Sequence, residues 1–287
     1  MTTSEPQGHF LFQSRVATLA TMHHKEQVIA PALQQLGLQT VVPALDTDQF
    51  GTFTRDVKRP GDQLATARLK AEAALRITGG DLAIASEGSF GSHPAVPWLP
   101  YNRELVILID RANDLEIVGE ALSTETNFDH TQVTDLEAAH AFAQKVGFPA
   151  HGLVVSAQPE GAGSELIKGI TSPLELTEAV TQMLKRFGQA HLETDMRAMH
   201  NPTRMRVIAQ ATEDLIRKIH RACPECGVPG FKAVEHFPGL PCADCGAPTR
   251  LTLTTRYQCQ KCSFEQRVLF PHQQRTADPA QCDYCNP

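Results

Sequence analysis

The eight cysteines of this chain constrain its fold more than any other feature, because all of them lie in the last 65 residues and all are spaced as CxxC. This two-residue spacing lets two thiolates reach one tetrahedral metal ion. A redox-active CxxC normally occurs once, at the start of a helix, so four such pairs indicate structural metal sites. Eight thiolates with no additional ligand predict two structural zinc ions, held by Cys223, Cys226, Cys242, Cys245, Cys259, Cys262, Cys282 and Cys285.

The segments between the pairs indicate which pairs share an ion. Residues 250–258 contain no Gly, Pro, Asn or Asp, so they predict one uninterrupted strand that holds the second and third pairs apart. Residues 227–241 and 263–281 contain Gly or Pro and can fold back. We therefore expect a sequential arrangement, with the first two pairs on one ion and the last two on the other. A nested or cross-braced arrangement stays open.

The charge of the cysteine-rich segment argues against nucleic acid as its partner. Residues 221–287 carry seven Lys or Arg and six Asp or Glu, and each four-thiolate zinc site adds a formal charge of −2. The resulting net charge of −3 is a poor match for phosphate. We therefore expect a structural module or a protein-contact surface, with nucleic acid only weakly supported.

Composition places the whole chain among globular proteins. It has 287 residues, of which 41% are hydrophobic and 20% charged, with a formal net charge of −6. This is too apolar for a disordered chain and too acidic for a protein whose whole surface binds nucleic acid. No run of about 18 apolar residues can span a bilayer, and the first residues lack an export signal. We expect a cytoplasmic protein with no membrane partner.

Strand and helix patterns alternate before the cysteine-rich segment. Apolar, β-prone runs are followed by segments in which hydrophobic residues recur at helical spacing. This alternation predicts an α/β fold with a three-layer, mixed or mainly parallel sheet. We divide the chain into a flexible tail (1–14), an α/β domain with an anion or nucleotide pocket (15–221) and a double zinc ribbon (222–287). The predicted strands are 15–21, 38–45, 81–85, 105–110, 115–119, 152–156 and 190–194, and the predicted helices are 25–36, 62–77, 134–146, 173–186 and 203–220.

Polar residues follow several predicted strands, at the sheet edge where open α/β folds bind their ligands. Lys25 at a helix N-terminus and Lys70 on the next helix can neutralise a phosphate, and residues 55–59 add two arginines. Carboxylates in the same loops offer the hard oxygen ligands that magnesium prefers. We therefore predict that the catalytic residues are Lys25, Asp48, Lys70 and Glu87, and that Thr21, His23, Ser86 and Ser89 bind substrate.

A second polar cluster surrounds the end of the predicted strand at residues 190–194. Glu193, Asp195 and Arg197 alternate with less polar residues and would share one face, just before the helix that begins at Pro202. Two interpretations stay open. The cluster is an ion-pair network that braces the helix, or it is an anionic-substrate site in which Asp195 and Arg197 bind the ligand.

Three motifs in the first part of the chain form a recognisable set. A strand ends in a T-x-x-x-K segment at residues 21–25, a helix contains A-x-x-K-A at residues 67–71, and the strand DLAIASEGSFG at residues 81–91 runs into an acidic glycine turn. Over about residues 15–120 this set resembles the house-cleaning nucleoside triphosphate pyrophosphatases of the inosine triphosphatase superfamily.

The resemblance implies roles for four residues. It implies that Thr21 and Lys25 bind phosphate, that Lys70 contacts the triphosphate and that Glu87 holds magnesium. The chain departs from the family pattern at His23, where the family has asparagine. Its first lysine also comes one residue early, and a serine precedes Glu87 where the family has a second acid.

Over its full length the chain resembles bacterial proteins of unknown function that join such a domain to tandem CxxC pairs, which implies no activity. Two functions therefore remain. The first is a magnesium-dependent hydrolase of a nucleotide or other phosphorylated metabolite, similar to a nucleoside triphosphate pyrophosphatase and carrying two structural zinc ions. The alternative is a non-enzymatic zinc-ribbon adaptor or regulator that binds protein or nucleic acid through the ribbons.

Overall fold

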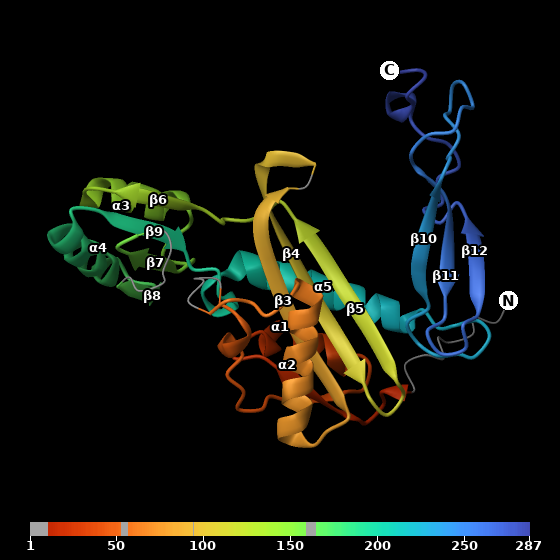
Figure 1. Ribbon diagram of the computed structural model, residues 1–287, viewed down its shortest axis with the longest axis horizontal. Coiled ribbons are helices and arrows are strands. Elements are labelled where there is room, and N and C mark those ends of the chain that lie inside the picture. Colours follow the sequence, from red (N-terminus) through yellow and green to blue (C-terminus); the bar gives the residue numbers. More distant parts are fainter. Residues whose placement is uncertain (1–10, 53–56, 94, 159–164) are drawn as a thin grey trace. The chain divides into compact units, whose positions relative to one another are not determined.

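The computed structural model describes residues 11–52, 57–93, 95–158 and 165–287 (Figure 1). The chain divides into two compact units, of which one is Phe12–Ile216 and the other contains Arg217–Pro287. Arg55, which the sequence places near the predicted site, lies outside the described residues, as do residues 1–10 of the predicted tail. The end of that tail is not free, because Phe12 is fully buried. Packed structure therefore begins earlier than residue 15.

The larger unit is built on a five-stranded sheet of mixed direction, with the strand order β2-β1-β3-β4-β5. Strand β1 runs parallel to both β2 and β3, whereas β3, β4 and β5 pair antiparallel. The mixed sheet predicted from the sequence is thus present, but β3 and β4 form a longer hairpin than predicted. The strands are β1 (Val16–Ala20), β2 (Gln39–Val41), β3 (Leu82–His93), β4 (Val96–Asp110) and β5 (Leu115–Ser123).

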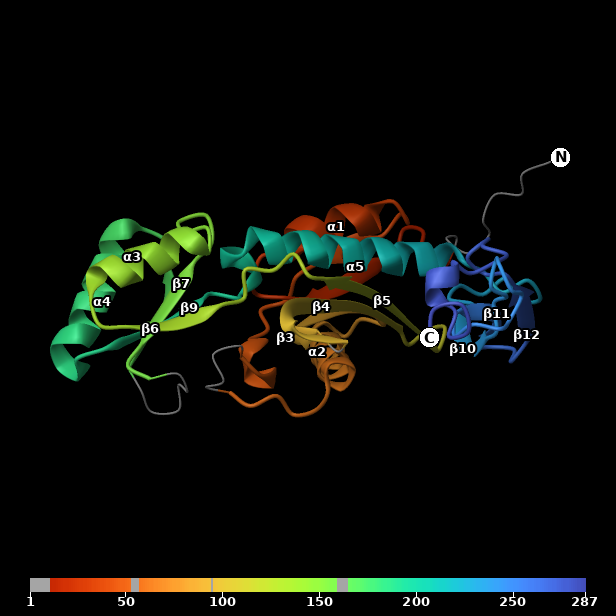
Figure 2. The same cartoon turned by 90° about the horizontal axis from the view of Figure 1, so that it is seen from above.

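Helices cover both faces of this sheet, which gives the predicted three layers. Helix α2 (Gln63–Thr78) lies on one face, while α1 (Glu26–Gln34) and α5 (Pro202–His220) lie on the other (Figure 2). The boundary between the two compact units falls inside α5, between Ile216 and Arg217. No helix in the described part of the chain is long and apolar enough to cross a membrane.

Helix α2 shows how local sequence positions these layers. The Asp62 side chain caps its first turn by accepting a hydrogen bond from the backbone N–H of Ala65, and Gly79 ends it in the left-handed conformation. Small residues along its buried face, among them Ala67 and Ala71, let the helix lie close to the sheet. Lys70 lies between them in sequence and is also buried. The sheet face therefore receives a lysine from a helix whose buried side is mostly apolar.

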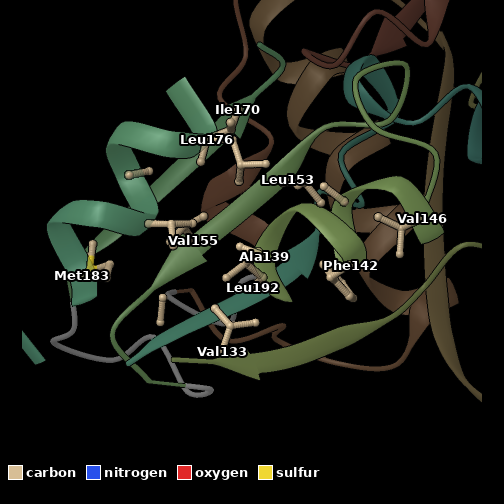
Figure 3. Close-up of a cluster of buried hydrophobic side chains, with 14 of the residues drawn as sticks. Val133, Ala139, Phe142, Val146, Leu153, Val155, Ile170, Leu176, Met183 and Leu192 are labelled. Carbon is tan, nitrogen blue, oxygen red and sulfur yellow. The ribbon is translucent and has the colours of Figure 1, made fainter. Parts of the chain in front are cut away.

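A second sheet of four antiparallel strands is inserted between β5 and α5, with the order β6-β9-β7-β8. Helices α3 and α4 pack on one face of it and share a hydrophobic core with Leu153, Val155 and Leu192 (Figure 3). We call this part, residues 126–196, the inserted module. Its elements are β6 (His130–Val133), α3 (Leu136–Lys145), β7 (Leu153–Ser156), β8 (Leu166–Ile170), α4 (Pro173–Phe187) and β9 (Ala190–Thr194).

The smaller unit contains a three-stranded antiparallel sheet with the order β10-β11-β12. Its strands are β10 (Lys232–Pro238), β11 (Thr252–Gln258) and β12 (Glu265–Leu269). The apolar core is small, since Phe231 packs with Tyr257, Phe264 and two buried cysteines. A core of this size indicates that the unit depends on further links between its segments.

Candidate functional site

The eight cysteines gather into two groups of four. In each group the Sγ atoms all lie within 4.8 Å of one another. Every CxxC pair contributes one buried and one exposed cysteine, so each group is open to solvent on one side only. The first group contains Cys223, Cys226, Cys259 and Cys262, and the second contains Cys242, Cys245, Cys282 and Cys285.

The sulfur positions fit a tetrahedral metal ion. Contacts between Sγ atoms of different CxxC pairs measure between 3.6 and 3.8 Å. A tetrahedral ion about 2.3 Å from each thiolate separates its sulfurs by about 3.8 Å, whereas a disulfide needs about 2.05 Å. Each group can therefore hold one metal ion, and neither is a set of disulfides.

This grouping corrects the sequential pairing expected from the sequence. Strand β10 pairs antiparallel with β11, so that Lys232 lies opposite Gln258 and Pro238 opposite Thr252. The first CxxC precedes β10 and the third follows β11, and they meet at one end of the sheet, while the second and fourth meet at the other. The segment expected to fold back forms β10 instead, because Gly230 precedes that strand and Pro238 ends it.

A second candidate site is a charged pocket in the larger unit, with a cavity volume of about 210 Å³. One wall is formed by the turn after β1, the middle of β3 and helix α2, and the other by the helix-free face of the inserted module. Six Lys or Arg side chains and four Asp or Glu side chains line it, so cations outnumber carboxylates. The charged lining residues are Lys25, Asp48, Arg59, Lys70, Glu87, Lys168, Glu193, Asp195, Arg197 and Arg204.

Cations hold the Glu87 carboxylate on both sides. Its Oε2 accepts a hydrogen bond from Lys70 Nζ at 2.6 Å, and its Oε1 lies 2.6 Å from Arg59 Nη2. Burial alone raises the pKa of Glu87, but the charges of Lys70 and Lys25 and the hydrogen bond from Lys70 outweigh it and hold that pKa below its ordinary value. Glu87 is therefore an ionised group that positions two cations at the pocket.

Lys25 has different surroundings, although it lines the same pocket. Its Nζ donates a hydrogen bond of 3.0 Å to the Ser86 hydroxyl, and both residues are buried. Burial, reinforced by the charges of Arg204 and Lys70, lowers the pKa of Lys25 to about 7. Its amine thus loses its proton near neutral pH, unlike an ordinary lysine.

The remaining predicted residues of this wall divide into two groups. His23, Asp48 and Ser89 line the pocket, whereas Thr21 and Ser86 are buried and do not. Asp48 Oδ1 lies 3.4 Å from His23 Nε2. The hydrogen bond from His23 lowers the pKa of Asp48, and burial lowers the pKa of His23. The pair is thus a neutral imidazole beside a carboxylate.

The opposite wall contains a residue that the sequence did not single out. Val154 pairs with Lys168 on one side and with Glu193 on the other, so these three side chains form a row across the inserted module. Alternation along each strand sends this row away from the core under α3 and α4 and toward the pocket that it lines. Lys168 was missed because residues 157–171 show no clear strand pattern in the sequence.

Asp195 and Arg197 come together as the sequence indicates, and both line the pocket. Arg197 Nη2 lies 2.6 Å from Asp195 Oδ2, which also accepts a hydrogen bond from the backbone N–H of Gly169 at 3.1 Å. The hydrogen bond from Gly169 connects the end of β9 to β8. The ion pair holds Arg197 at the edge of the pocket, and the assignment of Asp195 and Arg197 to ligand binding stays a prediction.

A buried ion pair forms part of the pocket wall, since Arg204 lines the cavity. Arg204, in the first turn of α5, donates from Nε to Glu104 of β4 at 2.8 Å, and its Nη1 donates to the backbone carbonyl of Met196 at 2.5 Å. The Arg204 side chain is 1% exposed and that of Glu104 is fully buried. The pair therefore ties α5 and the end of the inserted module to the first sheet.

A family model described as "Domain of unknown function (DUF6671)" matches residues 70–287, which is more than half of the chain. The chain belongs to this family. None of the curated proteins matches it. The DUF6671 match begins inside α2, so it contains Lys70, Glu87 and all eight cysteines but not Lys25 or Asp48. Its description assigns no activity, and the resemblance to the inosine triphosphatase superfamily stays a prediction.

The carboxylates predicted to bind magnesium do not form a metal site in this DUF6671 chain. Outside the two cysteine groups, the described residues contain no cluster of three His, Asp or Glu with metal-ligand spacing. Glu87 is already engaged by two cations, and Asp48 by His23. The pocket as it stands fits an anion better than a bare metal ion.

Proposed function

We propose that this DUF6671 protein is a hydrolase of a nucleotide or another phosphorylated metabolite, whose phosphate groups bind in the charged pocket. The observation that carries this proposal is the convergence of Lys25, Arg59 and Lys70 on one cavity. These cations come from three separate segments: the turn before α1, the loop before α2, and α2 itself. A cavity with cations on several sides favours an anion that accepts several hydrogen bonds at once.

The cations have different parts in this proposal. Lys70 and Arg59 are fixed by Glu87, so they stabilise charge on a phosphoryl group without having to reorient. Lys25 lies at the N-terminus of α1, where the positive end of the helix dipole also favours an anion. Its amine donates hydrogen bonds to a phosphate oxygen in either protonation state.

On the other side of the pocket, Lys168 and Arg197 of the inserted module face the same cavity. A ligand that extends from Lys70 toward this wall would contact cations at both ends. This favours a polyphosphate over a single phosphate group. Magnesium would enter together with the phosphates of such a ligand and would supply charge neutralisation at the phosphoryl oxygens, without a carboxylate site of its own in the pocket.

We further propose that zinc is the metal in both cysteine groups. Four thiolates in tetrahedral spacing are the ligand set typical of structural zinc, and they leave no open coordination position for catalysis. The two ions would supply the links that the small core of the C-terminal unit requires.

Incubation of the purified full-length chain with a panel of nucleoside triphosphates and inorganic tripolyphosphate tests the proposal. Release of phosphate and pyrophosphate is measured with and without magnesium. Lys70→Met should lower kcat by about 10²-fold or more, because it removes one preorganised cation. Arg68→Met is the matched control, since Arg68 lies on the same helix but pairs with Glu116 on the surface.

Two results would contradict the proposal. If the wild-type chain turns over no member of the panel under either condition, the hydrolase function is wrong and the adaptor alternative is favoured. If turnover is equal in Lys70→Met and Arg68→Met, the activity lies outside this pocket. Thermal unfolding of both variants is recorded alongside, so that a folding defect is not mistaken for a lost contact.

A further inference from the structure

Two buried lysines share the charged pocket, but their partners differ in chemical kind. Lys70 Nζ lies 2.6 Å from a carboxylate oxygen of Glu87, which stabilises the ammonium form. Lys25 Nζ lies 3.0 Å from the hydroxyl oxygen of Ser86, which carries no charge. The side-chain environment therefore favours the proton on Lys70 and offers no comparable stabilisation to the proton on Lys25.

The charges that reach Lys25 from the neighbouring elements reinforce this difference. Arg204 of α5 and Lys70 of α2 are the cations with the largest influence, and both disfavour a third positive charge. Burial in the pocket wall removes the water that would solvate an ammonium. A lysine that is desolvated beside other cations has the arrangement that activates amine nucleophiles in enzymes.

The carboxylates near Lys25 do not reverse this effect, because each is paired with a cation that has a larger influence on Lys25 than the carboxylate has. Glu104 is bound by Arg204 at 2.8 Å, and Glu87 is bound by Lys70 at 2.6 Å. The attraction of these carboxylates for a proton on Lys25 is smaller than the combined effect of burial and the two cations.

We infer that Lys25 is a nucleophilic amine that forms an imine with a small aldehyde or ketone carrying a phosphate or carboxylate group. The nitrogen lone pair attacks the carbonyl carbon and forms the carbon–nitrogen bond. The two amine hydrogens leave with the carbonyl oxygen as water, and the carbon–nitrogen double bond remains. No oxidant or further reactant is needed.

The other side chains of the cavity indicate that the ligand carries a phosphate or carboxylate group. Arg59 and Lys70 line the same pocket as Lys25, and both are held in place by Glu87. They would bind the anionic end of the ligand and leave its carbonyl group to Lys25. A cavity volume of about 210 Å³ restricts the ligand to a small molecule. The inference goes beyond hydrolysis and does not depend on it.

Reductive trapping with pyridoxal 5′-phosphate tests the inference. The full-length chain is exposed to this aldehyde for short times at pH 7.5, reduced with borohydride, and analysed by peptide mass spectrometry for the label on each lysine. At pH 7.5 about three quarters of an amine with pKa about 7 is unprotonated, against about one in 800 for an ordinary lysine. Lys25 should therefore be labelled at least about tenfold faster than Lys70 or the exposed Lys145.

Two further measurements separate the amine from the anion site. Pyridoxal, which lacks the phosphate, should label Lys25 more slowly than pyridoxal 5′-phosphate, and inorganic tripolyphosphate should slow labelling by pyridoxal 5′-phosphate. Ser86→Asp places a carboxylate beside the amine and should reduce labelling of Lys25 to the level of Lys70. Ser86→Ala is the matched control and should keep fast labelling.

Labelling of Lys25 no faster than that of Lys70 in the wild-type chain overturns the inference, whatever the variants do. Equal labelling by the two aldehydes overturns the anionic ligand class. Because trapping requires no turnover, a chain that hydrolyses nothing can still support the inference, and an active hydrolase can still contradict it.

Discussion

The grouping of the cysteines determines how many metal ions a doubly substituted chain retains. Cys226 and Cys262 belong to one group, and Cys245 belongs to the other. All three are exposed, whereas the first cysteine of every pair is buried, so serine can replace them with little loss of packing. Cys226→Ser with Cys262→Ser removes two ligands from one ion, while Cys226→Ser with Cys245→Ser removes one ligand from each ion.

The expected size of the effect follows from the ligand count. Structural zinc sites of four ligands bind with about 10–16 kcal/mol, so one thiolate accounts for about 3 kcal/mol, or about 10²-fold in affinity. A chelator can therefore be chosen that strips a site with three thiolates but leaves a site with four. In the presence of that chelator we expect the wild-type chain to keep two metal ions. The Cys226→Ser/Cys262→Ser variant should keep one ion, and the Cys226→Ser/Cys245→Ser variant should keep none.

Metal per chain is measured by native mass spectrometry of the full-length protein, which also reports whether each variant stays folded. The opposite result, with one ion kept by Cys226→Ser/Cys245→Ser and none by Cys226→Ser/Cys262→Ser, would restore the sequential pairing and refute the grouping. A nested arrangement would leave one ion only in Cys226→Ser/Cys285→Ser. The three double variants thus distinguish the three pairings.

Three substitutions in the larger unit test its packing and charges. Arg204→Met should lower the free energy of unfolding in urea by about 3–5 kcal/mol, because it leaves Glu104 charged and buried. The double variant Arg204→Met/Glu104→Leu should recover most of that loss, and a loss below about 1 kcal/mol in the single variant contradicts this prediction. Burial raises the pKa of Asp110, yet its hydrogen bonds, of which that from Arg15 is the strongest, hold this pKa below its ordinary value. The ionised Asp110 therefore stabilises the fold above about pH 4, and this contribution is lost as the pH falls further. Asp110→Asn should therefore lose less stability than wild type between pH 5 and pH 2, and parallel stability curves would show that the pair does not contribute. Gly119→Ala should lower the melting temperature, since its new methyl carbon would lie 2.2 Å from a backbone oxygen of α5. An unchanged melting temperature would mean that α5 does not pack against β5 as described.

Much of the architecture follows from periodicity alone, but the pairing of distant segments does not. Residues 250–258 were predicted as a strand that separates two CxxC pairs, and β11 occupies almost the same residues. The same reasoning treated Gly230 and Pro238 as signals for a fold-back. Gly230 precedes β10 and Pro238 is its last residue, and only the pairing of β10 with β11 reveals this. A glycine or proline marks the end of an element without indicating where the chain goes next.

The candidate site shows the same limit. The sequence predicts Lys25, Asp48 and Glu87 in loops that follow strands and Lys70 on a helix, and the structure brings all four to one pocket, although Glu87 lies in the middle of β3. Lys168 escaped notice because a short edge strand gives a weak pattern, and its direction is set by the partner strand β7. The sequence also does not show which carboxylate forms an ion pair with which basic side chain. These ion pairs decide whether a carboxylate such as Glu87 is available to a metal ion.

The place of α5 in the chain has a consequence for biosynthesis. A ribosome delivers β4 and β5 long before α5, because the whole inserted module lies between them in the sequence. During that interval Gly119 lacks its helix and Glu104 lacks Arg204, so one side of the nascent sheet stays exposed. The inserted module has its own core and can collapse as soon as it emerges. We expect fragments that stop before residue 202 to aggregate or to recruit chaperones, even though every strand of the first sheet has been made.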